Sequence, residues 1–416
     1  MNSKVKERME QIKERYGLDK YRFHSYDIYR YVTAHCETEY ILSTEWIPDH
    51  EEGVRDGETL PEGAAVVEVN LHSDKLKRLV FVEGKSFAEP TGINPEEIEE
   101  VISWIEELTG LIHNQQFHLK SQSGSSYVFQ ECLNGVRVYG GGTIEVTFNS
   151  EGELVLFSVT GSYPDEDLVQ KEPFTLQLEE VLDIAYEQFQ YFEYPMIKRK
   201  QWIPLYGLKE AVLITNQEKN LFVPDDQSCI QMDELLSWDT PIQQPFTSRK
   251  SVLEPHFSFE QAVAREPHPD LTPLTDNERQ ECLVSVTDVM REAFSDESGK
   301  WKLVKLYRDR GNITAVVKPV QPDRKLFSRK IIMIIDPETF SVLHYMDTGA
   351  FQQAYEDFEH VPSPKMTIEE AWKKVKPELE LKPVYVYHRD EQQYILCGKI
   401  DCSSAVDVST GDIIKF

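Results

Sequence analysis

The stretch NPEEIEEVISWIEELTG, residues 94–110, decides the fold that we expect, together with the sequences that follow it. Asn94 is a favoured N-cap, Pro95 suits the first helical position, and Gly110 is a typical residue just after a helix. Apolar residues recur between these ends at spacings of three and four, the period of an amphipathic helix. They are Ile98, Val101, Ile102, Ile105 and Leu108.

Short stretches of alternating apolar and polar residues follow this helix. Such alternation predicts half-buried antiparallel strands, because every second side chain lies on the same face. The stretches are 117–119, 127–129, 136–139, 143–148 and 154–160. The segment therefore predicts one helix packed over a small antiparallel sheet.

The same order of elements recurs along the chain. A capping box at Thr367–Glu370 opens a C-terminal copy, a second box at Thr275–Glu278 opens another, and a looser copy begins with a helix over 3–16. Each copy ends in two strands joined by a polar turn that starts with Asp or Asn. The turns are 70–74, 149–152, 336–339 and 407–411. The recurrence favours an internal repeat, although any antiparallel hairpin can carry such a turn.

Residues 175–192 predict a further helix, and residues 195–255 show no clear period. The Pro-rich stretch 267–273 is expected to mark the main boundary between two halves. We expect the domains to be 1–90, 91–170, 171–255, 256–360 and 361–416.

These patterns predict an α+β protein of tandem units in two halves, each unit being one helix packed on a small antiparallel sheet. Neighbouring sheets are expected to pair edge to edge, because a short sheet otherwise exposes unpaired strand edges.

Two stretches resemble known families. Residues 134–141, NGVRVYGG, lead into an alternating strand and the turn at Gly152, and resemble the PepSY-like modules of bacterial protease propeptides. Residues 367–371 and 407–414 are similar to the YcdB/YcdC repeats of Bacillus-type proteins, in which a T/S-x-E-E-A helix precedes a D-x-x-T-G turn. The resemblance implies helix-on-sheet units and a role in binding or restraining other proteins.

Composition argues against two classes of partner. The 416 residues include 44 Lys and Arg against 72 Asp and Glu, a formal charge of −28. Nucleic acids and anionic membranes attract basic proteins, so we expect the chain to bind neither. Tyr26, Tyr29 and Tyr31 interleave with two arginines, as in an RNA-stacking sheet, but the net charge disfavours this role.

The chain is expected to be cytoplasmic. Residues 1–16 are rich in Lys and Glu, so no signal peptide is expected, and no run of about 18 apolar residues occurs. An even number of cysteines is compatible with disulfides, but in a chain without an export signal we expect reduced thiols. They are Cys36, Cys132, Cys229, Cys282, Cys397 and Cys402.

Linear motifs for catalysis are incomplete. His50-Glu51 would begin H-E-x-x-H, but position 54 is Val. His35, Glu37 and Glu39 occupy alternate positions and could share one face around a divalent metal, although a solvated strand face explains them equally well. Gly140–Gly142 lacks a following helix to bind phosphate, so these glycines predict a bulge or sharp bend in the sheet.

We therefore expect no catalytic, cofactor-binding or metal-ligating residues and no cofactor. The function that the sequence favours is that of a non-enzymatic protein- or peptide-binding, regulatory protein. One alternative is a hydrolase or metal-dependent enzyme whose site is assembled between units, and another is a set of units that mediates self-assembly. The sequence leaves the oligomeric state open.

Overall fold

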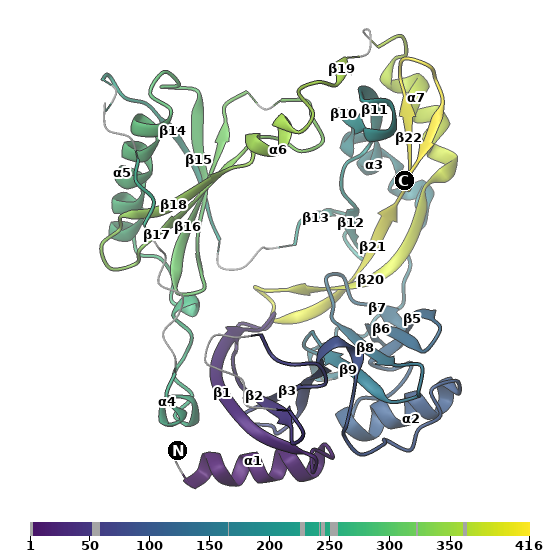
Figure 1. Ribbon diagram of the computed structural model, residues 1–416. Helices are drawn as coiled ribbons and strands as arrows, with labels where there is room; N and C mark the ends of the chain where they lie inside the picture. Colours follow the sequence, from purple (N-terminus) through teal and green to yellow (C-terminus); the bar gives the residue numbers. More distant parts are fainter. Residues whose placement is uncertain are drawn as a thin grey trace. The chain divides into compact units, whose positions relative to one another are not determined.

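The computed structural model describes residues 3–51, 59–164, 166–224, 229–240, 242, 246–249, 257–321, 323–360 and 364–416 (Figure 1). Strands take up 39% of the described residues and helices 22%. The chain forms two compact units. Unit 1 comprises Met1–Gln170, Pro255–His268 and Tyr385–Ile395, and unit 2 comprises Lys171–Glu254, Pro269–Val384 and Leu396–Phe416.

Unit 1 contains a nine-stranded sheet in the order β1-β2-β3-β4-β9-β8-β6-β5, with β7 paired to β6. All of these neighbouring strands are antiparallel. The strands are β1 (Tyr21–Val32), β2 (Thr38–Pro48), β3 (Ala65–Asn70), β4 (Leu76–Phe81), β5 (Phe117–Ser123), β6 (Ser126–Leu133), β7 (Val136–Arg137), β8 (Thr143–Phe148) and β9 (Leu154–Val159).

Strands β4 and β9 join two groups of strands into this one sheet. Their register is Arg78↔Ser158, Leu79↔Phe157 and Val80↔Leu156. We call this pairing the seam. The expectation that neighbouring sheets pair edge to edge is confirmed here, because the seam satisfies backbone groups that would otherwise lie at two open edges.

Helices α1 (Ser3–Arg15) and α2 (Ile98–Thr109) pack on the same core beside this sheet. Ile12 of α1, Ile105 of α2 and Phe157 of β9 belong to one continuous buried cluster. Gly110 ends α2 with a φ of 74°, and its N–H donates to the Glu106 carbonyl, as predicted. The predicted start is wrong, because α2 begins at Ile98 and the Asn94 side chain instead accepts the Glu96 N–H in a turn.

Unit 2 contains three further sheets, with strand orders β14-β15-β16-β17-β18, β10-β11-β22-β23 with β19 beside β11, and β13-β12-β21-β20. The tip of the β20–β21 hairpin, Tyr385–Ile395, belongs to unit 1. The strands are β10 (Phe189–Met196), β11 (Gln201–Leu208), β12 (Val212–Thr215), β13 (Leu221–Phe222), β14 (Ile230–Leu236), β15 (Trp301–Asp309), β16 (Asn312–Pro319), β17 (Ile331–Ile335), β18 (Val342–Asp347), β19 (Glu359–His360), β20 (Glu380–His388), β21 (Gln393–Asp401), β22 (Ser404–Asp407) and β23 (Ile413–Lys415).

The predicted capping boxes of two helices are confirmed: Thr275 caps α5 and Thr367 caps α7, each in reciprocal hydrogen bonding with a Glu side chain. The remaining helices are α3 (Leu182–Gln188), α4 (Phe259–Val263), α5 (Asp276–Ala293), α6 (Gly349–Gln353) and α7 (Ile368–Val375). Short 3₁₀ turns are η1 (Val82–Gly84), η2 (Glu166–Leu168), η3 (Leu178–Glu180), η4 (Ile197–Arg199), η5 (Pro269–Leu271) and η6 (Lys376–Glu378). Every described helix is too short or too polar to cross a membrane.

The predicted fold class, an α+β array of one helix per small sheet, is wrong. The described residues are mostly strand, in four large sheets with few helices. The physical reason is visible in unit 1, where the strands that follow two successive helices merge through the seam and share a single core. A small sheet exposes unpaired backbone groups at its two edges. When two such sheets pair edge to edge, they become one sheet, and the two predicted units are no longer separate.

Two local predictions are also wrong. The helix expected over 175–192 is limited to α3, and Phe189 already begins β10. The region 195–255 is not irregular throughout, because β11–β14 lie within it. Residues 202–205 of β11 are all buried, so this strand lacks the alternation that reveals a half-buried strand. Parts of this region lie outside the described residues.

The shared core of unit 1 yields a test. Phe157 has no exposed surface and its ring lies 5.3 Å from that of Trp104, so we expect Phe157→Ala to lower the free energy of unfolding of unit 1 by about 3–5 kcal/mol. Urea unfolding followed by hydrogen exchange measures this loss. Phe351→Ala, at a side chain that is 63% exposed in unit 2, is the matched control and should change stability by less than about 0.5 kcal/mol.

Candidate functional site

The three residues of the metal hypothesis do not converge. His35 lies in the turn between β1 and β2, where its Nε2 is 2.9 Å from the Tyr394 hydroxyl. Glu39 lies in β2, where it accepts a hydrogen bond from the Tyr31 hydroxyl and pairs with Lys77 at 2.8 Å. Cys36 has a φ of 60°, so the strand alternation that would align His35 with Glu39 is broken. Among the described residues, no three His, Cys, Asp or Glu side chains are placed to hold a metal ion.

Two other candidates from the sequence, His50 and Gly140–Gly142, have contacts that account for their positions in the fold. The His50 ring packs against Phe87 at 4.6 Å, and position 54 lies outside the described residues. Gly140 has a φ of 67°, and a Cβ on Gly142 would lie 1.9 Å from the Thr160 carbonyl oxygen. The predicted bend at Gly140–Gly142 is therefore confirmed, and one of its glycines permits close backbone approach.

Tyr29 and Tyr31 line a groove of about 520 Å³ on the sheet face opposite the core, which we call the open-face groove. Ile28 and Leu42 belong to the core, so their neighbours Tyr29 and Ile41 point to the other face. Burial and hydrogen bonding to Glu68 raise the pKa of Tyr29. Burial alone would raise the pKa of Glu39, but hydrogen bonds from Lys77 and Tyr31 lower it. The polar groups of this open-face groove thus largely satisfy one another.

Glu131 is a buried carboxylate in β6, only 1% exposed. Its Oε2 accepts the Gly142 N–H at 2.6 Å and its Oε1 accepts the Tyr163 N–H at 3.0 Å. Burial raises the pKa of Glu131, although these backbone donors oppose the shift. A Cβ on Gly161 would lie 2.5 Å from Oε2, so the local backbone is built around this side chain. Its oxygens are committed to the fold, and we assign it a structural role.

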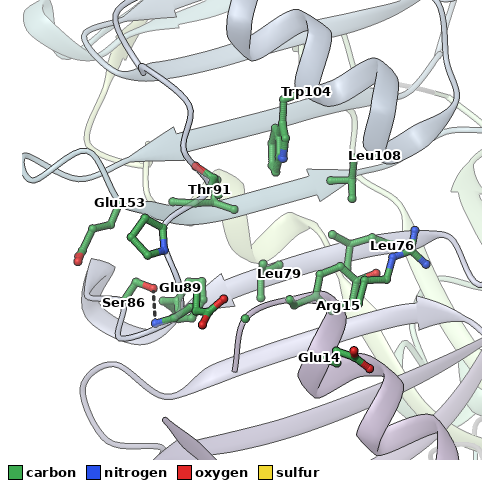
Figure 2. A pocket seen from close by; sticks show the side chains of 16 residues that line it. Glu14, Arg15, Leu76, Leu79, Ser86, Glu89, Thr91, Trp104, Leu108 and Glu153 are labelled. Carbon is green, nitrogen blue, oxygen red and sulfur yellow. Dashed lines mark hydrogen bonds between the residues drawn. The ribbon is translucent and has the colours of Figure 1, made fainter. Parts of the chain in front are cut away.

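The seam bears a second hollow, of about 280 Å³, which we call the seam hollow (Figure 2). Its floor is apolar and comes from the two strands of the seam. Trp104 and Leu108 of α2 point toward Leu79 on this floor, and the end of α1 and an extended segment form the remaining walls. The floor residues are Leu76, Leu79, Phe81 and Leu154, with Glu153 beside them; the last residues of α1 and the two that follow it contribute Glu14–Gly17, and the extended segment contributes Ser86 and Ala88–Thr91.

Gly17 positions the wall beside α1. Its φ of 65° turns the chain at the end of the helix, and its carbonyl accepts the Glu89 N–H at 2.9 Å. A Cβ at Gly17 would lie 2.9 Å from the Cβ of Glu89, so only glycine allows this approach. Ser86 is buried, and its hydroxyl accepts the Ala88 N–H at 3.2 Å, which fixes the segment that carries Glu89 (Figure 2).

The rim of the seam hollow is acidic. Glu14 and Glu89 are exposed and Glu153 is half-buried. Arg15 is the cation among the lining residues, and its guanidinium donates to the Asp74 carbonyl at 3.1 Å and lies 5.7 Å from the Tyr16 ring. Tyr16 also lines the hollow, and its buried hydroxyl has no hydrogen-bond partner within the described part of the chain; the charges that act on it are those of Arg15 and Asp74.

This arrangement places an apolar floor beneath a polar rim. The described residues that line the hollow include neither histidine nor cysteine. The floor leucines and Phe81 are each at most 6% exposed, so they form a fixed surface. Sequence patterns placed Trp104 and Leu79 only as helix and strand positions. The hollow depends on the seam, which joins segments far apart in the chain. No pattern of neighbouring residues in the sequence predicts this pairing.

The raised pKa of Glu131 predicts a pH dependence. Since the folded-state pKa lies above the ordinary value of 4.5, stability from this group is present below that value and lost as pH rises through the folded pKa. Urea midpoints measured upward from pH 4 should show wild-type protein losing stability relative to Glu131→Gln. A difference independent of pH would contradict this, and Glu145→Gln, at an exposed carboxylate of β8, is the control.

Comparison with known proteins gives little to add to this geometry. No family model matches the chain, and no curated protein matches it. Among solved structures, the Bacillus megaterium YpeB C-terminal domain aligns over 83% of this chain and 97% of that chain, with 8% identity and a TM-score of 0.25. We draw no argument from a similarity at that score.

Proposed function

We propose that this protein is a non-enzymatic binding protein that holds a segment of another protein or a peptide in the seam hollow. The observation that carries the proposal is an apolar floor, set in a rigid sheet, that opens between α1 and α2 under an acidic rim. Interfaces are anchored by a few apolar side chains in such recesses, with a polar rim around them.

Preorganisation supports this role. The floor residues Leu79 and Phe81 are part of the core cluster of unit 1, so binding does not require them to become ordered. A ligand that meets a preformed surface loses less conformational freedom on the protein side. The volume of about 280 Å³ fits one large side chain better than a drug-sized molecule, for which pockets of roughly 300–1,000 Å³ are usual.

The resemblance of residues 134–152 to PepSY-like modules, and of residues 367–371 and 407–414 to YcdB/YcdC repeats, is in keeping with protein binding.

The charge of the chain argues against some classes of partner. With a formal charge of −28, we place nucleic acids and anionic membranes outside its partners, and we propose that the protein acts in the cytoplasm. The partner is then a protein or peptide that meets the seam hollow in solution.

Blocking the hollow tests the proposal. Thr91 is an exposed residue of the lining, so Thr91→Trp should fill the hollow without disturbing the core. Peptides selected from a random displayed library on the wild-type protein should bind this variant at least about tenfold more weakly, as expected when a central apolar anchor is lost. Fluorescence anisotropy of labelled peptides measures the affinity.

Ser103→Trp is the matched control, because Ser103 is an exposed residue of α2 outside the lining. Peptides should bind this control as they bind the wild-type protein. Selected peptides that bind Thr91→Trp undiminished, or a library that yields none, would contradict the proposed function.

A further inference from the structure

We infer that the segment held in the seam hollow is basic and amphipathic: one large apolar side chain flanked by Lys or Arg, on a segment of another protein. This inference rests on the proposed function and adds the chemistry of the partner. It follows from the charges around the hollow and from its size.

Acidic side chains outnumber basic ones around the seam hollow. Three carboxylates, those of Glu14, Glu89 and Glu153, lie among the lining residues, against a single guanidinium. That guanidinium, of Arg15, already donates to the Asp74 carbonyl. Glu153 accepts a hydrogen bond from the Asn149 amide at 2.9 Å, which leaves Glu14 and Glu89 as the exposed carboxylates of the rim. The hollow therefore presents negative charge to an incoming segment.

The end of α1 carries charges of both signs. Lys13, Glu14 and Arg15 lie in its last turn, so two cations already offset the partial negative charge of the helix dipole there, and the carboxylates of the rim remain the source of negative charge. With a net charge of −28 on the whole chain, an acidic segment would be repelled both at long range and at the rim.

The shape of the hollow favours a segment that carries an apolar side chain beside its cations. Its floor is Leu76, Leu79, Phe81 and Leu154, and Trp104 and Leu108 stand beside them. A single Leu, Phe or Trp side chain matches an apolar recess of about 280 Å³. The cations that flank this anchor would then lie at the level of Glu14 and Glu89.

The open-face groove provides the contrast. There, Lys77 of the lining pairs with Glu39 at 2.8 Å, and Tyr29 is hydrogen-bonded to Glu68. Two of the charged side chains that line that groove, Lys77 and Glu68, therefore already have partners within unit 1. Glu14 and Glu89 at the seam hollow differ from Glu39, because neither is paired with a basic side chain within the described part of the chain.

Labelled synthetic peptides of alternating Lys and Leu clusters test the inference directly. The full-length protein should bind such a peptide with an affinity that falls as NaCl is added, because exposed ion pairs are screened. The same peptide with Glu in place of Lys, and a peptide of Lys without Leu, should bind far more weakly. Anisotropy titrations give all three affinities.

Variants of the rim sharpen the test. Removing both exposed carboxylates in Glu14→Gln/Glu89→Gln should weaken binding of the Lys/Leu peptide about fivefold, from the loss of two partly exposed ion pairs. The matched control Glu99→Gln/Glu107→Gln removes the same charge from the first and last turns of α2, at residues outside the lining, and should leave affinity within about twofold.

The outcomes separate the two proposals. If library-selected peptides lose affinity in Thr91→Trp but are not basic, and Glu14→Gln/Glu89→Gln binds them unchanged, the charge inference is overturned while the proposed function stands. If Thr91→Trp has no effect on any peptide, both are overturned.

Sedimentation at several protein concentrations tests whether a second copy of this chain, and not another protein, occupies the seam hollow. Ile197 is 68% exposed and is followed by the exposed Lys198 and Arg199, so a second copy could supply the same chemistry. Self-association that is lost in Glu14→Gln/Glu89→Gln would identify a second copy as the occupant and overturn the assignment to another protein. A monomer at all concentrations would support it.

Discussion

The antiparallel pairing of β4 with β9 is the constraint on which the rest of unit 1 depends. Three residue pairs join Arg78–Val80 to Leu156–Ser158 and turn two groups of strands into one sheet. Unpaired strand edges are costly and prone to aggregation, so the pairing stabilises both groups at once. Its consequence is that α1 and α2 contribute to one core, and that the surface between them has a floor made of seam residues.

Sequence patterns predicted the features that arise within about ten residues of one another. The capping boxes at Thr275 and Thr367, the end of α2 at Gly110 and the bend at Gly140–Gly142 are all local in this sense. The features that the sequence did not predict depend on distant partners. Leu79 pairs with Phe157 across more than seventy residues of chain, and nothing in either strand specifies the other.

The errors within single elements have a related cause. β11 is buried on both faces over 202–205, so its sequence shows no alternation. The apolar stripe of residues 175–192 predicts one helix, but α3 covers only Leu182–Gln188 of this stretch. Phe189, which belongs to the same stripe, pairs instead with Leu208 in a hairpin. In both cases tertiary pairing overrides the local period. The seam hollow was not predicted for the same reason, since its lining comes from four separate stretches of chain.

The carboxylates of unit 1 differ in what satisfies them, and this difference decides which of them can recognise a ligand. Glu131 accepts backbone N–H groups in the interior, and Glu39 is paired with Lys77 and Tyr31. Neither is free to meet another molecule, and a general acid or base must reach its substrate. Glu14 and Glu89 stand at the rim of an apolar recess and are exposed. Because the floor is also the core of the sheet, its residues cannot vary without loss of stability, so under our proposal the choice of partner falls to the charges at the rim.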